Sequence, residues 1–232
     1  MEEDALRIAA LADGTRRALY EYVVAQPEAV GRERAALALG LAAHNVAFHL
    51  DRLVAEGLLV VEYRRLGNKT GPGAGRPSKL YRRSPREFTV SLPPRHYDLV
   101  GDILAGAVER NLNGEALEVA LTQEARAHGR ILAARAKSTP GSDPLDLLAG
   151  ILAGQGYEPE ITAKVARLRN CPFEALAQKH TALVCSLNRD FVQGICEGLG
   201  TRSITSCLEP EEGQCCVKAR ADSGLEHREA LN

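Results

Sequence analysis

The spacing of apolar side chains predicts helices at the start of the chain. Apolar and charged positions alternate with a helical period over 5–12, and Asp13 is placed to cap a helix over about 15–25. A short helix is predicted over 31–38, and Gly40 ends it because glycine interrupts a helical pattern. The chain is therefore expected to begin as a group of short helices.

The next helix is predicted over 42–55, with Gly57 as the residue that ends it. Its apolar residues Val46, Leu50 and Leu53 recur at offsets of four and three, which places them on one face. Two helices joined by a tight turn containing glycine form a helix-turn-helix. The sequence predicts this motif from the helix over 31–38 and the helix over 42–55.

A β-hairpin is expected directly after this motif. The alternating, β-rich stretch 58–63 predicts one strand, and 79–83 predicts the return strand. Glycine and proline crowd the stretch 67–75 between them, as in a loop. A hairpin that follows a helix-turn-helix is a wing. We therefore predict a winged helix-turn-helix DNA-binding domain over 1–94, closed by Pro93 and Pro94.

The pattern after residue 94 predicts a mixed region. Helices are expected over 96–112, 115–136, 144–154, 172–179 and 183–198, and strands over 157–161, 163–168, 203–208 and 215–218. We divide the region into linking or dimerisation helices over 95–140, a C-terminal α+β domain with the cysteines over 141–220, and a polar tail over 221–232. The predicted fold class is α+β.

Charge is unevenly distributed, although the net charge is only −1. Residues 58–95 hold nine Lys and Arg against two Asp and Glu, whereas residues 96–232 hold 14 against 19. Most charge runs are merely solvated surface. Here the basic residues fall on the predicted hairpin beside a helix-turn-helix, and that position favours an anionic partner.

The predicted DNA contacts lie on one helix and on the wing. The helix over 42–55 is expected to enter the major groove, with phosphate contacts supplying most of the affinity. Arg76, at the end of the loop, is expected to reach a narrow minor groove. The predicted contacts are Ala43, His44, Asn45, Phe48, His49 and Arg52 on the helix, and Arg64, Arg65, Lys69, Arg76 and Lys79 on the wing.

Two further expectations concern assembly and compartment. Winged domains of this size usually act as dimers, and the apolar helix over 96–112 is the candidate homodimer element, unless it packs only on its own second domain. No apolar stretch approaches about 20 residues, so no membrane span is expected. The acidic start Met1-Glu2-Glu3-Asp4 does not resemble a signal peptide. These features predict a cytoplasmic protein with reduced thiols.

All six cysteines fall in one 46-residue window near the C-terminus. In a reducing compartment such clustering indicates metal or redox chemistry, and the alternative is a set of unrelated buried thiols. The members are Cys171, Cys185, Cys196, Cys207, Cys215 and Cys216.

Position ranks these cysteines as candidate ligands. Cys171 precedes Pro172 and is expected at a helix N-terminus, which favours its thiolate. Together with Cys185 and one or both of the adjacent pair Cys215 and Cys216, it could hold an iron–sulfur cluster or a zinc ion. The absence of a short Cys-x₂₋₄-Cys hook favours the cluster, which is larger than a single ion.

The other candidates rank lower. Cys196 shares a predicted helix with Cys185 at a separation of about 16 Å, so we expect a packed core thiol. Cys207 is kept in reserve on a predicted strand, and His180 is a possible nitrogen ligand.

The residues also carry a family resemblance. Residues 42–83, AAHNVAFHLDRLVAEGLLVVEYRRLGNKTGPGAGRPSKLYRR, resemble the winged helix of ArsR-like regulators that include the Suf-operon repressor (SufR) family. The stretch NCPFEALAQKHTALVC and the later Cys-Cys pair resemble the cluster-binding tail of that family. The resemblance implies a homodimeric repressor that binds a double-stranded DNA operator. It also implies a 2Fe-2S or 4Fe-4S cluster on Cys171, Cys185 and Cys215, with Cys216 as the neighbouring candidate.

Three alternatives remain open. The first is the same DNA-binding protein with a zinc site in its tail. The second is a regulator that binds a small organic ligand, with the cysteines as bystanders. The third is a thiol enzyme that uses Cys171 or Cys185 as nucleophile, for which His180 is the nearby candidate base.

Overall fold

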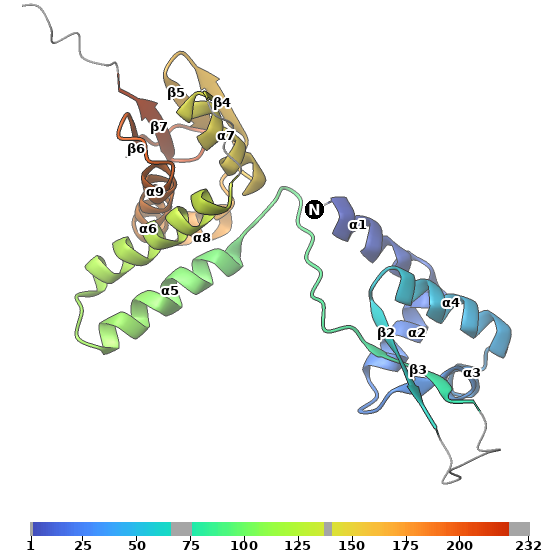
Figure 1. The fold of residues 1–232 in the computed structure, drawn as a ribbon. Helices are drawn as coiled ribbons and strands as arrows, with labels where there is room; N and C mark the ends of the chain where they lie inside the picture. Colours follow the sequence, from blue (N-terminus) through green and yellow to red (C-terminus); the bar gives the residue numbers. More distant parts are fainter. Residues whose placement is uncertain (1, 66–75, 137–140, 223–232) are drawn as a thin grey trace, which may run out of the picture. The chain divides into compact units, whose positions relative to one another are not determined.

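The computed structural model describes residues 2–65, 76–136 and 141–222. The chain is a mixed α+β protein with two small sheets (Figure 1). It divides into two compact units, residues 1–90 and residues 91–232, each of which has its own hydrophobic core.

The first unit contains the predicted helices and the predicted hairpin. Asp13 caps α2 as expected, because its carboxylate accepts a hydrogen bond from the Arg16 amide at 2.9 Å. Gly40 ends α3 with a left-handed φ of +65°. The elements are α1 (Glu2–Ala9), a 3₁₀ turn (Ala10–Ala12), α2 (Gly14–Val24), β1 (Val30–Gly31), α3 (Arg32–Leu39), α4 (Ala43–Ala55), β2 (Leu59–Arg64) and β3 (Ser78–Arg83).

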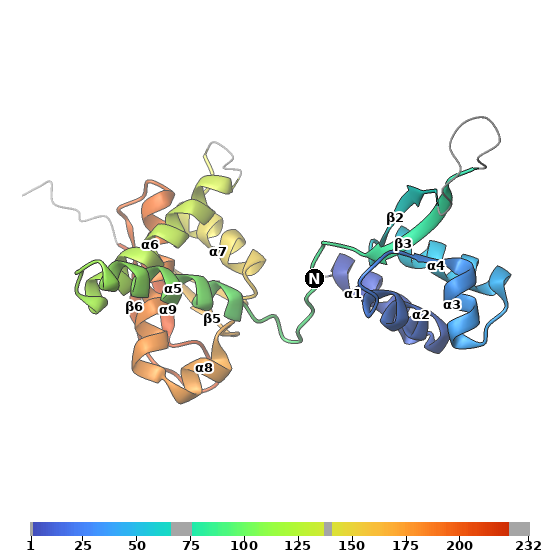
Figure 2. The ribbon, with the colours of Figure 1, turned by 90° about the horizontal axis from the view of Figure 1, so that it is seen from below.

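Strands β2 and β3 pair in antiparallel fashion, with Val61 opposite Tyr81. The two-residue strand β1 pairs with the other side of β3, so the sheet order is β1-β3-β2. The sequence pattern did not predict β1. Figure 2 shows helices α2, α3 and α4 beside the hairpin. As predicted, Val46, Leu50 and Leu53 of α4 are fully buried in the core of this unit.

The second unit contains every predicted helix, although several bounds differ by two residues or less. Helix α8 begins at Glu174 rather than at Pro172, α9 begins at Thr181, and β7 begins at Val217. The elements are α5 (Tyr97–Leu112), α6 (Leu117–Arg135), α7 (Pro144–Gly154), β4 (Pro159–Thr162), β5 (Val165–Leu168), α8 (Glu174–Lys179), α9 (Thr181–Gly198), β6 (Ile204–Leu208) and β7 (Val217–Ala221).

The sheet of the second unit is antiparallel throughout, in the order β4-β5-β7-β6. Its buried face carries Ala166, Ile204 and Ala219, which join the core formed with α7 and α9. Alternate residues such as Thr205 and Arg220 are exposed, which is the usual pattern of an antiparallel sheet covered on one face.

Helices α6 and α9 cross closely because small residues meet at the crossing. A Cβ on Gly129 of α6 would lie 2.2 Å from the Phe191 carbonyl oxygen, and one on Gly194 of α9 would lie 2.2 Å from the Arg126 carbonyl oxygen. Only glycine allows the two backbones to approach so far. Over the described residues, no helix is both long enough and apolar enough to cross a bilayer.

This crossing predicts an asymmetry between two glycine substitutions. We expect Gly194→Ala to lower the free energy of unfolding of the second unit by more than about 2 kcal/mol, because the new methyl group meets helix backbone. Gly150→Ala in α7 is the matched control, since its Cβ would have no neighbour within 4 Å. The control should leave stability unchanged or raise it by up to about 1 kcal/mol. Urea unfolding followed by circular dichroism measures both, and equal effects would contradict the close crossing.

Candidate functional site

The exposed face of α4 lies beside the hairpin within the first unit. Ala43, His44 and Asn45 in its first turn are exposed, and Phe48 is 66% exposed. His49 is half-buried, and its ring lies edge-on to that of Phe48 at a centroid distance of 5.3 Å. The exposed face of α4 therefore presents one aromatic ring and the polar side chains of His44 and Asn45.

Asp51 fastens α4 to the hairpin. Its carboxylate accepts a hydrogen bond from Lys79 Nζ at 2.5 Å and another from the Tyr81 hydroxyl at 2.7 Å. Burial and this bond raise the pKa of Tyr81 well above its usual value, so the hydroxyl keeps its proton. The hairpin is therefore held at a fixed distance from α4 by side-chain bonds as well as by the core.

Several of the predicted DNA contacts have acidic partners within their own unit. Arg52 pairs with Glu56 at 2.6 Å, and Arg64 pairs with Glu28 at 3.4 Å. Arg65 and Arg76 are exposed on either side of the loop, and Lys69 lies outside the described residues. Both ion pairs are at least partly exposed, so each contributes little to stability.

In the second unit, three separate segments bring four cysteines together. Cys171 lies in the loop between β5 and α8, and Cys185 lies near the start of α9. Cys215 and Cys216 lie in the turn that precedes β7. Cys185 and Cys215 are buried, whereas Cys171 and Cys216 are partly exposed.

Cys215 lies where the other two segments meet. Its amide donates a hydrogen bond to the Leu168 carbonyl at 2.8 Å, which ties it to the end of β5 just before the Cys171 loop. Its sulfur accepts a hydrogen bond from Nδ2 of Asn188 at 3.3 Å. Asn188 follows Cys185 by one turn of α9, so the two side chains lie on the same face of the helix.

Asn188 is a member of the site that the sequence reasoning missed. Its amide is buried, and its Oδ1 accepts a hydrogen bond from the Tyr157 hydroxyl at 2.5 Å. Tyr157 in turn packs edge-on against Phe173, two residues beyond Cys171. The signal in the sequence that could have indicated Asn188 was an asparagine one turn from a cysteine on an apolar helix face.

The thiols interact in two pairs. A hydrogen bond from the Cys215 thiol lowers the pKa of Cys171 to about 7, and the Phe173 amide and the Arg95 guanidinium act in the same direction. The interaction with Cys171, together with burial, raises the pKa of Cys215. Burial and contact with Cys216 raise the pKa of Cys185 to about 12. The two adjacent cysteines thus face different partners.

The local backbone accounts for this pairing. We expected Cys171 at a helix N-terminus, and that was wrong: α8 begins three residues later, at Glu174. The Phe173 amide in the preceding turn supports the Cys171 sulfur instead. Cys215 and Cys216 were assigned to a strand, but they lie in a turn that follows Gly213, whose φ is +73°.

The remaining cysteines and His180 lie outside this group. Cys196 is fully buried in the core, as predicted, and burial raises its pKa to about 12. Cys207 lies on β6, and its sulfur is 3.4 Å from Oε1 of Glu209. His180 is exposed at the end of α8. Among the described residues, no three His, Cys, Asp or Glu side chains surround a single point as one bound metal ion requires.

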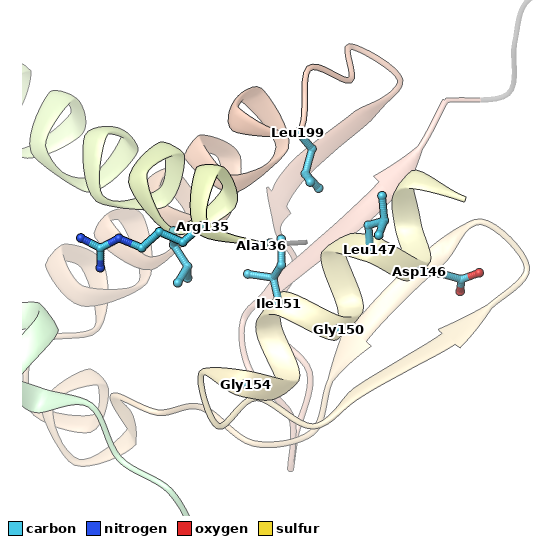
Figure 3. A pocket seen from close by; sticks show the side chains of 9 residues that line it. Arg135, Ala136, Asp146, Leu147, Gly150, Ile151, Gly154 and Leu199 are labelled. Carbon is cyan, nitrogen blue, oxygen red and sulfur yellow. The ribbon is translucent and has the colours of Figure 1, made fainter. Parts of the chain in front are cut away.

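The second unit also contains an apolar pocket of about 360 Å³ (Figure 3). It lies between the end of α6, helix α7 and the residue after α9, and none of the six cysteines lines it. Leu132, Leu147 and Ile151 form its apolar wall, and Asp146 and Arg135 are its charged residues. The volume falls at the small end of the range for pockets that bind small molecules.

Comparison of the chain with protein-family models, with curated proteins and with solved structures gave no match in any of the three.

The thiol pairing predicts selective alkylation of the reduced, metal-free protein. Because the pKa of Cys171 is lowered to about 7, this thiol should react with iodoacetamide at neutral pH and reach a rate plateau above about pH 8. Cys196, with a pKa raised to about 12, should stay unmodified and serves as the internal control. Peptide mass spectrometry over a pH series measures both rates. A Cys171 rate that still climbs steeply above pH 9 would contradict the pairing.

Proposed function

We propose that this protein is a DNA-binding transcriptional regulator, acting as a repressor, that senses iron–sulfur or redox status through a cluster bound in its second unit. The observation that carries the proposal is the convergence of Cys171, Cys185, Cys215 and Cys216 from three segments. These are the cysteines that the resemblance to SufR-type regulators names.

The first unit supports the DNA-binding half of the proposal. Helices α3 and α4 joined through Gly40 have the order of a helix-turn-helix, and the β2–β3 hairpin that follows has the position of a wing. In this reading α4 enters the major groove, where His44 and Asn45 face base edges. The exposed Arg65 and Arg76 flank the loop, from which Arg76 would reach a narrow minor groove.

The thiols of the four cysteines meet as two pairs, Cys171 with Cys215 and Cys185 with Cys216. Cysteine thiolates are the usual ligands of a 2Fe-2S or 4Fe-4S cluster, so these four residues would hold one. The Asn188 amide and the Phe173 N–H donate to sulfurs, and such bonds stabilise thiolates. When bound, a 2Fe-2S or 4Fe-4S cluster supplies sensitivity to oxidants and to iron supply.

The protein's own residues would convert that sensitivity into a change of affinity for the operator. Without a bound group, Cys215 and Cys185 would be buried neutral thiols, because burial disfavours their charged forms. The three segments then lose a common attachment. A population shift between the two arrangements would alter the spacing of the two reading helices in a dimer.

We place the protein in the cytoplasm as a homodimer. The inner face of α5, with Val100, Ile103 and Ala107, is buried within its own unit. Its outer face leaves Val108 at 49% and Leu112 at 80% exposure. One face of α5 can therefore pack on its own unit while the opposite face pairs with a second copy.

A second candidate keeps DNA binding and assigns sensing to a small organic ligand. The observation that favours it is the pocket between α6 and α7, with its apolar wall and two charged residues. A zinc site in the tail would instead draw on Cys171, Cys185 and Cys215. The metal analysis described below separates these readings from the cluster.

Binding of the hairpin to DNA predicts a specific effect of Arg76→Ala. We expect weaker binding to a duplex selected from a random library, and a salt slope lower by about one, because one positive charge in contact with the DNA is lost. Arg86→Ala is the control, since Arg86 lies beyond the end of β3 that is far from the loop and pairs with Asp4. Fluorescence anisotropy across a salt series measures both. An unchanged slope in Arg76→Ala would contradict the contact.

Ligation of a cluster predicts that Cys171→Ser loses most of its iron, its acid-labile sulfide and its brown colour when prepared without oxygen. Cys207→Ser is the matched control, because this thiol is partly exposed and contacts Glu209 outside the group of four. Iron, sulfide and zinc assays with absorption spectra measure the result. Full iron content in Cys171→Ser would overturn the ligand assignment, and wild-type protein with zinc alone would favour the zinc reading.

A further inference from the structure

The segment that leaves the first unit is fastened to the Cys171 loop as soon as it enters the second. Residues 91–96 follow the last residue of the first unit, and α5 begins at Tyr97. Three consecutive residues of this segment, Pro94, Arg95 and His96, make polar contacts with the loop that carries Cys171.

Arg95 is the central contact. Its Nη1 donates to Oδ1 of Asn170 at 2.6 Å and to the backbone carbonyl of Cys171 at 2.8 Å. Its Nη2 donates to the carboxylate of Glu174 at the start of α8. The side chain is only 16% exposed. One planar guanidinium therefore joins the chain before Cys171, the Cys171 peptide group and the helix after it.

Asn170 and His96 complete the attachment. Nδ2 of Asn170, a buried side chain, donates to the Pro94 carbonyl at 3.2 Å and to the Gly156 carbonyl at 2.5 Å. The His96 amide donates to the Pro172 carbonyl at 3.2 Å. Gly156 has a φ of +77°, and a Cβ there would lie 2.6 Å from Pro94 Cβ, so the segment lies directly against this turn.

We propose that Arg95, together with Asn170, is the positioning residue through which occupancy of the cysteine site controls the segment leading to the DNA-binding unit. This inference rests on the proposed function. The Cys171 sulfur faces Cys215, whereas its carbonyl accepts from Arg95. Any rotation of this residue that accompanies binding or release at the sulfur therefore moves the acceptor of Arg95. Because the contacts fall on three consecutive residues, the segment follows the loop or detaches from it.

The first arm of the test uses the reduced protein without a cluster. Hydrogen exchange of the peptide covering 91–97 should be about tenfold faster in Arg95→Ala than in wild type, because without the Arg95 bonds the segment opens more often and exposes the His96 amide that donates to Pro172. Arg169→Ala is the matched control: Arg169 lies in the same loop but pairs with Glu160 on β4. Arg95→Lys keeps the positive charge but lacks the planar guanidinium, so its exchange rate should resemble that of Arg95→Ala. Wild-type exchange in Arg95→Ala would overturn the attachment.

The second arm measures the ratio of the operator Kd values with and without the cluster. When Arg95→Ala is compared with wild type at equal iron per chain, this ratio should fall to within about twofold of one. Arg169→Ala should keep the wild-type ratio. A wild-type ratio in Arg95→Ala would overturn the coupling alone. A wild-type protein that binds neither iron nor DNA would overturn the proposed function, so the two failures are distinguishable.

Discussion

The close approach of α6 and α9 is the constraint on which the second unit depends. Gly129 and Gly194 let two helix backbones meet without intervening side chains, and this fixes α9 along its length. The first half of α9 carries Cys185 and Asn188, and the second half carries the buried Cys196. The position of Cys185 thus depends on Gly194, nine residues further along the same helix. The element that closes the core also presents the Cys185 thiol to Cys216 and the Asn188 amide to Cys215.

The first unit combines a buried core with ion pairs on its surface. Asp51 accepts hydrogen bonds from Lys79 and Tyr81, Glu28 pairs with Arg64, and Glu56 pairs with Arg52. The surface around α4 and the hairpin is therefore less positive than its count of Lys and Arg suggests.

Local features of the chain were predictable because their causes are local. Asp13 caps its helix through a residue three positions away, Gly40 ends α3 through its own φ, and Val46, Leu50 and Leu53 follow the period of one helix. Strand β1 was not predicted because two residues are too few to show the alternation of apolar and polar side chains that marks a strand. Its existence depends on pairing with β3, about 50 residues later in the chain.

The composition of the cysteine site was predictable to a similar degree. Four cysteines could be named from their clustering and from a family resemblance, but their pairing depends on a left-handed Gly213 and on the turn it allows. The parts played by Arg95, Asn170, Tyr157 and Asn188 arise from contacts between residues that are distant in sequence. No spacing rule connects such residues, and only the folded chain places them together.

Strand β1 has a consequence for how copies of this protein can associate. It pairs only with Leu80 and Tyr81 of β3, so β1 and β2 are the two edge strands of the sheet and the longer free edge lies on β2. That edge carries Glu62, Tyr63 and Arg64, and charged side chains on an exposed edge oppose the addition of a foreign strand. Edge-to-edge joining of sheets is thereby disfavoured along β2.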